Sequence, residues 1–177
     1  FRDRAVRGDA ALEQGLQLDA WAYEPGLPSN AQAPHSDAFD RVDAAVEAFN
    51  AGGAPDASLW DGWVTQERQR FLQKLPRQLD RARLDALEGA FHLNATGNSE
   101  VLFNWLELVV ANHYDPGVES LTHFLSSQGR GKFVRPLYRA LMAQGDWGRP
   151  IARRIYASAR ATYHPIVANA LDRIVTG

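Results

Sequence analysis

The sequence contains no cysteine among its 177 residues. Disulfide bonds, thiolate metal sites and cysteine nucleophiles are therefore excluded, whereas the compartment stays open between cytosol and periplasm, of which we favour the cytoplasm. A long hydrophobic run is also missing, because Asn104 and Glu107 interrupt the most apolar stretch. No signal-peptide pattern opens the chain. We therefore expect a soluble protein with no membrane partner.

Strong net charge and the common catalytic motifs are absent as well. The formal net charge is −2, which argues against a nucleic-acid partner. The H-E-x-x-H pair of zinc peptidases does not occur, because the residues after the five histidines are Ser36, Leu93, Tyr114, Phe124 and Pro165. Nucleophile-elbow, Walker A and dinucleotide-binding patterns are missing too. We predict neither a metal site nor a catalytic residue in this chain.

The composition is typical of one core-forming domain, with 45% hydrophobic and 23% charged residues. Proline and glycine concentrate in residues 24–34, which predicts an irregular linker. We therefore assign residues 1–30 to a lead-in and linker, and residues 31–177 to the main domain. Because the first residue is Phe1 and not methionine, we expect the chain to be a piece of a longer polypeptide.

Apolar residues recur at helical intervals in about eight segments, the first of them behind a possible cap at Ser36. No alternating strand pattern competes with them, so we predict an all-α fold. Short turns between the segments favour a stack of short antiparallel helices. Such a stack is typical of an α-α superhelix of the armadillo or HEAT type, although no fixed-period repeat is visible.

Residues 101–110 are apolar on nearly every side, which predicts a central buried helix capped near Asn98. A β-strand is the alternative for this stretch. Trp105 should belong to the core. The other tryptophans lie near predicted helix ends, where we expect them to seal contacts rather than form a stacking platform for bases or sugars: Trp21, Trp60, Trp63 and Trp147.

Residues 128–138 form a loop whose composition suits anion binding. Arg130 offers a planar fork of donors, Lys132 adds a mobile ammonium group, and Gly129 and Gly131 let the backbone approach a ligand. We expect Pro136 to occupy the first position of the following helix, which would direct free N–H groups toward the loop. A solvated surface loop is the alternative reading.

Four segments together resemble one family: residues 21–28, residues 98–105, residues 129–137, and His164 with Pro165. The family is that of leukotriene A4 hydrolase and the related zinc aminopeptidases of the gluzincin group. The resemblance covers the C-terminal helical domain of such enzymes. It implies that residues 1–30 are the tail of a catalytic domain outside this chain.

The resemblance implies that zinc is a cofactor of the full-length enzyme, held on a separate domain by H-E-x-x-H and a downstream glutamate. The helical domain then contacts the N-terminal and catalytic domains and closes one side of the substrate cleft. The resemblance assigns the carboxylate end of short peptide substrates to Arg130 and Lys132. Gly129, Gly131 and Arg135 support the loop, Arg135 in a structural role. The alternative function is a helical-repeat scaffold that binds a partner protein.

Overall fold

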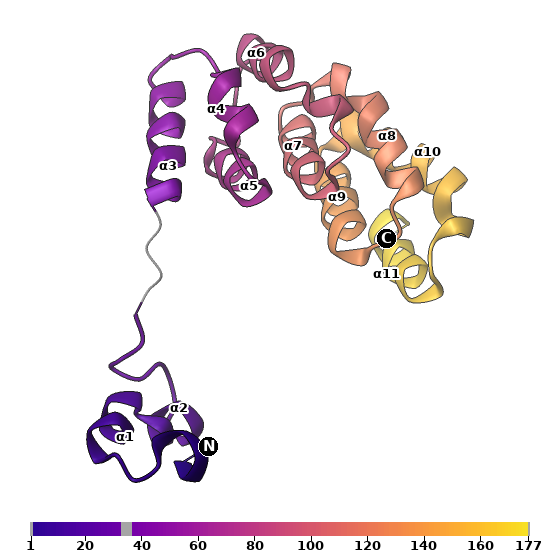
Figure 1. The fold of residues 1–177 in the computed structure, drawn as a ribbon. Coiled ribbons are helices and arrows are strands. Elements are labelled where there is room, and N and C mark those ends of the chain that lie inside the picture. The colour runs from indigo at the N-terminus through magenta and orange to yellow at the C-terminus, as the bar shows by residue number, and fades with distance from the viewer. Residues whose placement is uncertain (1, 33–36, 177) are drawn as a thin grey trace. The chain divides into compact units, whose positions relative to one another are not determined.

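The computed structural model describes residues 2–32 and 37–176, and within these ranges the only regular elements are helices. The predicted all-α fold is therefore confirmed (Figure 1). The chain divides into two compact units, Phe1–Asp37 and Ala38–Gly177. The cap predicted at Ser36 lies outside the described residues. None of the described helices is long and apolar enough to cross a membrane.

The first unit contains a π-helix at Arg2–Val6 and two short α-helices, α1 (Ala10–Leu16) and α2 (Leu18–Tyr23). Val6 is the only buried residue among residues 2–32. Polar contacts hold the segment after α2, because the Trp21 indole donates to Asn30 Oδ1 over 3.0 Å. Residues 2–32 therefore form no hydrophobic core of their own. Their assignment to a neighbouring catalytic domain stays a prediction.

The second unit holds nine α-helices within residues 37–176, where about eight were predicted. The additional helix is α4, whose six residues are too few to show a hydrophobic period. The helices are α3 (Asp37–Asn50), α4 (Ala57–Gly62), α5 (Thr65–Lys74), α6 (Arg81–Phe91), α7 (Ser99–Ala111), α8 (Val118–Ser127), α9 (Gly131–Ala143), α10 (Gly145–Ala159) and α11 (Pro165–Val175).

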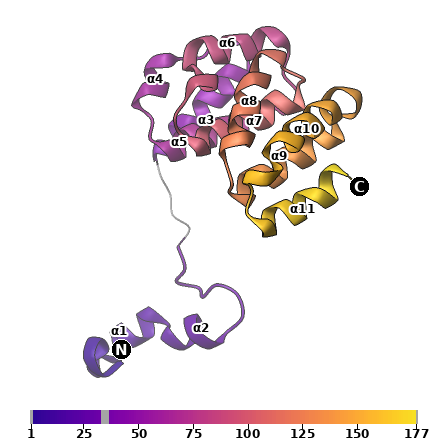
Figure 2. The same ribbon diagram turned by 90° about the vertical axis from the view of Figure 1, so that its right-hand side faces the viewer.

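These helices follow one another in space nearly as they do along the chain (Figures 1 and 2). Helices α3 to α6 lie at one end of the second unit and α9 to α11 at the other, with α7 packed against α5, α8 and α9. Sequential packing of this kind agrees with a stack of helices. Its superhelical character stays a prediction.

Helix α7 is the buried central helix that the sequence predicts, and the strand alternative is wrong. The Asn98 side chain caps it by accepting hydrogen bonds from the backbone N–H groups of Glu100 and Val101. Trp105 is fully buried, and its indole donates to Asn94 Oδ1 over 2.8 Å. The buried indole N–H thus has the partner that its burial demands.

Three tyrosines join α8 and the last three helices. The Tyr138 and Tyr163 hydroxyls lie 3.1 Å apart, and the Tyr163 hydroxyl donates to the Leu125 carbonyl. The Tyr156 hydroxyl donates to Asp172 Oδ1 over 2.7 Å, and Arg160 pairs with both oxygens of that carboxylate. Pro165 is the first residue of α11 behind the cap at His164, a position where its missing N–H costs no helical hydrogen bond.

The contacts of Asp172 predict a dependence of stability on pH. Hydrogen bonds from Arg160 and Tyr156 lower the pKa of Asp172 to about 2, below the value of about 3.9 in an unfolded chain. Because the folded-state pKa is the lower one, the stabilisation is present above the unfolded pKa and is lost as the pH falls toward 2. Asp172→Asn should lower the melting temperature at pH 7, and the difference from the parent should shrink between pH 4 and about 2.

Thermal melts of both proteins across that pH range measure this difference. Asp61→Asn, which removes an exposed acidic group that lies outside the first turn of its helix, α4, is the matched control and should track the parent throughout. A constant gap between Asp172→Asn and the parent from pH 7 to pH 2 would show that the charge of Asp172 contributes nothing.

Candidate functional site

Of residues 128–138, which the sequence predicts as an anion-binding loop, only 128–130 connect α8 to α9, and the rest belong to α9, which begins earlier than predicted. Gly131 is its first residue, Arg130 is its N-cap, and Pro136 lies inside the helix. The prediction that Pro136 opens the helix is therefore wrong. The missing N–H of Pro136 removes one bond to the Lys132 carbonyl near the helix start. The buried series Phe133, Val134, Leu137, Tyr138 and Leu141, which runs across the proline, offsets that loss.

The new helix start moves both predicted cations to the first turn of α9. The N–H groups of Phe133 and Val134 donate to the Arg130 carbonyl over 3.0 and 3.2 Å. The N–H groups of Gly131 and Lys132 precede the first intrahelical bonds, so they add positive potential beside the two side chains. Neither Gly129 nor Gly131 has a positive φ. Backbone conformation therefore does not require glycine at either position.

Arg130 is the available cation of this turn. Its side chain is exposed, and its guanidinium carbon lies 5.6 Å from the centre of the Phe133 ring. The Phe133 ring is buried and gives the guanidinium a firm support. In the described part of the chain, no carboxylate forms an ion pair with Arg130. The fork of donors can thus meet an incoming carboxylate.

Lys132, by contrast, already has a partner. Its ammonium group pairs with the Glu100 carboxylate, and it lies 4.6 Å from the centre of the same Phe133 ring. Glu100 belongs to the first turn of α7, and its other oxygen accepts a hydrogen bond from Gln69 over 3.3 Å. Both members of the pair are partly exposed, so the pair is weak enough to exchange. A ligand carboxylate would compete with Glu100 for Lys132.

Glu100 is the site residue that sequence reasoning missed. In the sequence, Glu100 is part of the capped start of the helix that follows Asn98. Glu100 and Lys132 are 32 positions apart in the sequence and give no local signal of contact, and only the packing of α7 against α9 brings them together. The one sequence feature that points to Glu100 is its acidic side chain, which can pair with a cation of the expected carboxylate site.

Arg135 packs against the helix start and makes no ion pair in the described residues. Its buried Nε has no hydrogen-bond acceptor there. A Cβ atom on Gly131 would lie only 3.1 Å from that nitrogen. Gly131 therefore provides room for the Arg135 side chain, and the two residues shape the turn that carries Arg130.

The described residues contain no group of three or more histidine, cysteine or acidic side chains that could hold a metal ion. His113 stacks on Trp147 with ring centres 4.7 Å apart, and its Nε2 lies 2.8 Å from Gln144 Oε1. The zinc that the family resemblance implies therefore finds no ligand set within residues 2–32 and 37–176.

Comparison with known proteins defines the class. Residues 63–175 match the family described as leukotriene A4 hydrolase, C-terminal, so this helical chain belongs to that family. It is 30% identical over 176 residues to leucine aminopeptidase 2 of Ajellomyces capsulatus, covering 94% of this chain and 27% of that protein. It is 24% identical over 170 residues to aminopeptidase B of Mus musculus, covering 91% of this chain and 26% of that protein.

The fold is also that of a solved enzyme. Native leukotriene A4 hydrolase from Saccharomyces cerevisiae superposes with a TM-score of 0.75 at 20% identity, over 99% of this chain and 31% of that chain. Our chain thus spans about a quarter of the length of the curated relatives that it matches. It corresponds to one domain of a larger polypeptide in those proteins.

Proposed function

We propose that this chain is the C-terminal domain of a zinc-dependent aminopeptidase and that it anchors the C-terminal carboxylate of short peptides. The observation that carries the proposal is Arg130, an exposed guanidinium at the start of α9 without an ion pair among the described residues. A carboxylate fits its fork in a bidentate arrangement, which a point charge cannot offer.

Lys132 is the second cation of this proposed site, and Glu100 sets its availability. In the free domain, Glu100 neutralises Lys132. A peptide carboxylate held by Arg130 would lie beside Lys132 and draw its ammonium group away from Glu100. Because an exposed ion pair contributes no more than about 1 kcal/mol, the exchange costs little. Arg130 therefore orients the ligand, and Lys132 adds charge.

The proposal assigns zinc and the catalytic base to a domain outside this chain, where zinc activates water for peptide hydrolysis. This chain then closes one side of the cleft against the N-terminal and catalytic domains. Its cations would select for length, because only a short peptide can place its amine at the zinc and its carboxylate on Arg130. Binding to the isolated domain should be weak, since one end of the ligand is free.

Peptide hydrolysis by the 177-residue chain and by the longer polypeptide that contains it tests whether the catalytic groups lie outside this chain. The 177-residue chain alone should give a helical circular dichroism spectrum and no hydrolysis of tripeptides or amino-acid amides. The longer polypeptide that contains it should hydrolyse both and lose activity with a chelator. Hydrolysis by the isolated chain would contradict the proposal. A longer polypeptide without H-E-x-x-H and without activity would favour the helical-repeat scaffold.

A further inference from the structure

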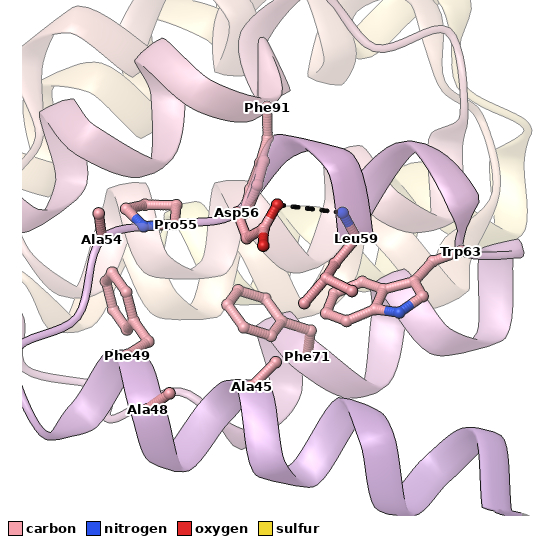
Figure 3. Close-up of a pocket in the computed structure, with 10 residues that line it drawn as sticks. All are labelled: Ala45, Ala48, Phe49, Ala54, Pro55, Asp56, Leu59, Trp63, Phe71 and Phe91. Carbon is pink, nitrogen blue, oxygen red and sulfur yellow. Dashed lines mark hydrogen bonds between the residues drawn. The ribbon is translucent and has the colours of Figure 1, made fainter.

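A cavity of about 180 Å³ lies among the first four helices of the second unit, and the proposed peptide site does not use it. Figure 3 shows side chains from α3, α4, α5 and α6 and from the segments before and after α4 around this space. Nine of its ten lining residues have apolar side chains, and four of them carry aromatic rings: Ala45, Ala48, Phe49, Ala54, Pro55, Asp56, Leu59, Trp63, Phe71 and Phe91.

The walls of this cavity are braced against collapse. The ring centre of Phe71 lies 6.2 Å from that of Phe49, 5.8 Å from that of Phe91 and 5.4 Å from that of Trp63. These are distances at which aromatic rings attract one another in edge-to-face or tilted arrangements. Phe49, Phe71 and Phe91 are themselves buried. The rings are therefore fixed by the core and leave the space open.

Contacts behind the lining hold two of these rings. The Phe91 ring stacks on the buried Trp60 with centres 4.3 Å apart. The Arg83 guanidinium carbon lies 3.7 Å from the centre of the Phe49 ring, and Arg83 also donates to the Phe49 carbonyl. Ala45 and Ala48 present only methyl groups to the cavity from α3. The space exists because these two positions carry small side chains.

Asp56 is the one charged group in the lining. Its Oδ1 caps α4 by accepting hydrogen bonds from the Ser58 hydroxyl over 2.6 Å and from the Ser58 and Leu59 N–H groups over 2.9 and 3.2 Å. All three bonds go to Oδ1, and Oδ2 accepts none of them. The same bonds, that of the Ser58 hydroxyl first, lower the pKa of Asp56, so the carboxylate is charged at neutral pH. The lining of this aromatic cavity thus includes a charged carboxylate, that of Asp56.

We infer that this cavity binds a small aromatic amine, with its ring among Phe49, Phe71 and Phe91 and its ammonium group on Asp56 Oδ2. The size supports one ring, because an apolar cavity of about 150 Å³ in another protein binds benzene. The charge selects the substituent, because a carboxylate attracts an ammonium group and repels an anion. A peptide helix or an extended strand is too large for this space. This site is independent of Arg130 and of the proposed peptidase function.

Phenethylamine is the probe that tests the site. Phenylacetate is the matched control ligand, because it has the same ring and the opposite charge. Titration into the protein labelled with ¹⁵N at the tryptophan indoles should move one indole N–H resonance, that of Trp63, in a saturable way. Phenethylamine should bind about tenfold more tightly than phenylacetate, as one charge-assisted contact predicts. Asp56→Asn keeps the capping oxygen and removes the charge, so it should make the two affinities nearly equal.

Filling the cavity is the second arm of the test. Ala45→Leu adds three carbon atoms to the lining and should abolish the shift of the Trp63 resonance. Ala44→Leu, at an exposed position on the same helix, should leave binding unchanged. Circular dichroism checks that each variant is folded, and Ala48→Leu replaces Ala45→Leu if the latter is not.

Three results with the 177-residue chain would overturn the inference. They are the absence of a saturable shift up to about 20 mM phenethylamine, a range that covers millimolar affinity; equal binding of both probes by the parent; and undiminished binding by a folded cavity-filling variant. Binding by the 177-residue chain that is lost in a longer polypeptide would also overturn it, because a side chain of that polypeptide would then fill the cavity.

Discussion

Trp105→Ala should lower the free energy of unfolding by about 3–5 kcal/mol, the range for a large aromatic side chain removed from a packed core. Trp105 is fully buried in α7, and its ring meets that of Tyr114 edge to face with centres 5.6 Å apart. The substitution leaves a cavity and also deprives Asn94 Oδ1 of its indole donor. Since domains of this size are stable by only about 5–15 kcal/mol, the variant should be partly unfolded at room temperature.

Urea melts followed by far-ultraviolet circular dichroism measure this loss. Trp105→Phe separates its two causes, because the ring is largely kept while the hydrogen bond to Asn94 is lost. Trp21→Ala is the control, since that side chain is 52% exposed and lies in the other unit. A change of less than about 0.5 kcal/mol for Trp105→Ala would be incompatible with a core role.

The parts of the fold that could be predicted from the sequence carry strong local signals. The run 101–110 is apolar on nearly every side and follows a capping asparagine, so both the burial and the start of α7 are encoded within a few residues. Pro165 marks the start of α11 in the same way, because its missing N–H costs nothing at the first helical position.

Pro136 shows the limit of that reasoning. The same residue type that opens α11 lies inside α9, and the difference is tertiary. Phe133 and Val134, before the proline, are buried together with Leu137 and Tyr138 after it. Packing of both sets requires one continuous helix, which outweighs the loss of a single backbone bond. A hydrophobic period that runs through a proline is the sequence signal for this case.

For the candidate site as well, the sequence indicates the residues with a local signal and not the contacts between distant helices. Both the cationic side chains beside the two glycines and the family resemblance indicate Arg130 and Lys132 as candidates for anion binding. The Glu100 partner of Lys132 and the aromatic cavity depend on contacts between helices far apart in the chain. Side chains from four helices and from the segments on either side of α4 form that cavity, so no single sequence window contains its pattern.

Arg130→Ala in the longer enzyme should lower kcat/KM for a tripeptide by about tenfold to a hundredfold, the equivalent of about 1.5–3 kcal/mol for a lost charge-assisted contact. The same peptide with an amidated C-terminus should be a poorer substrate of the parent and should be nearly unaffected by the substitution. Amino-acid amides, which do not reach α9, should also be cleaved at the parent rate.

Two further variants separate binding from general damage. Lys132→Ala should cost less than Arg130→Ala, because Glu100 already neutralises Lys132 and a flexible ammonium group makes a less exacting contact. Arg139→Ala, at an exposed position further along α9, is the matched control and should behave as the parent. Equal losses on the free acid, the amidated peptide and the amino-acid amides would assign Arg130 a structural role, and the carboxylate anchor would have to lie elsewhere.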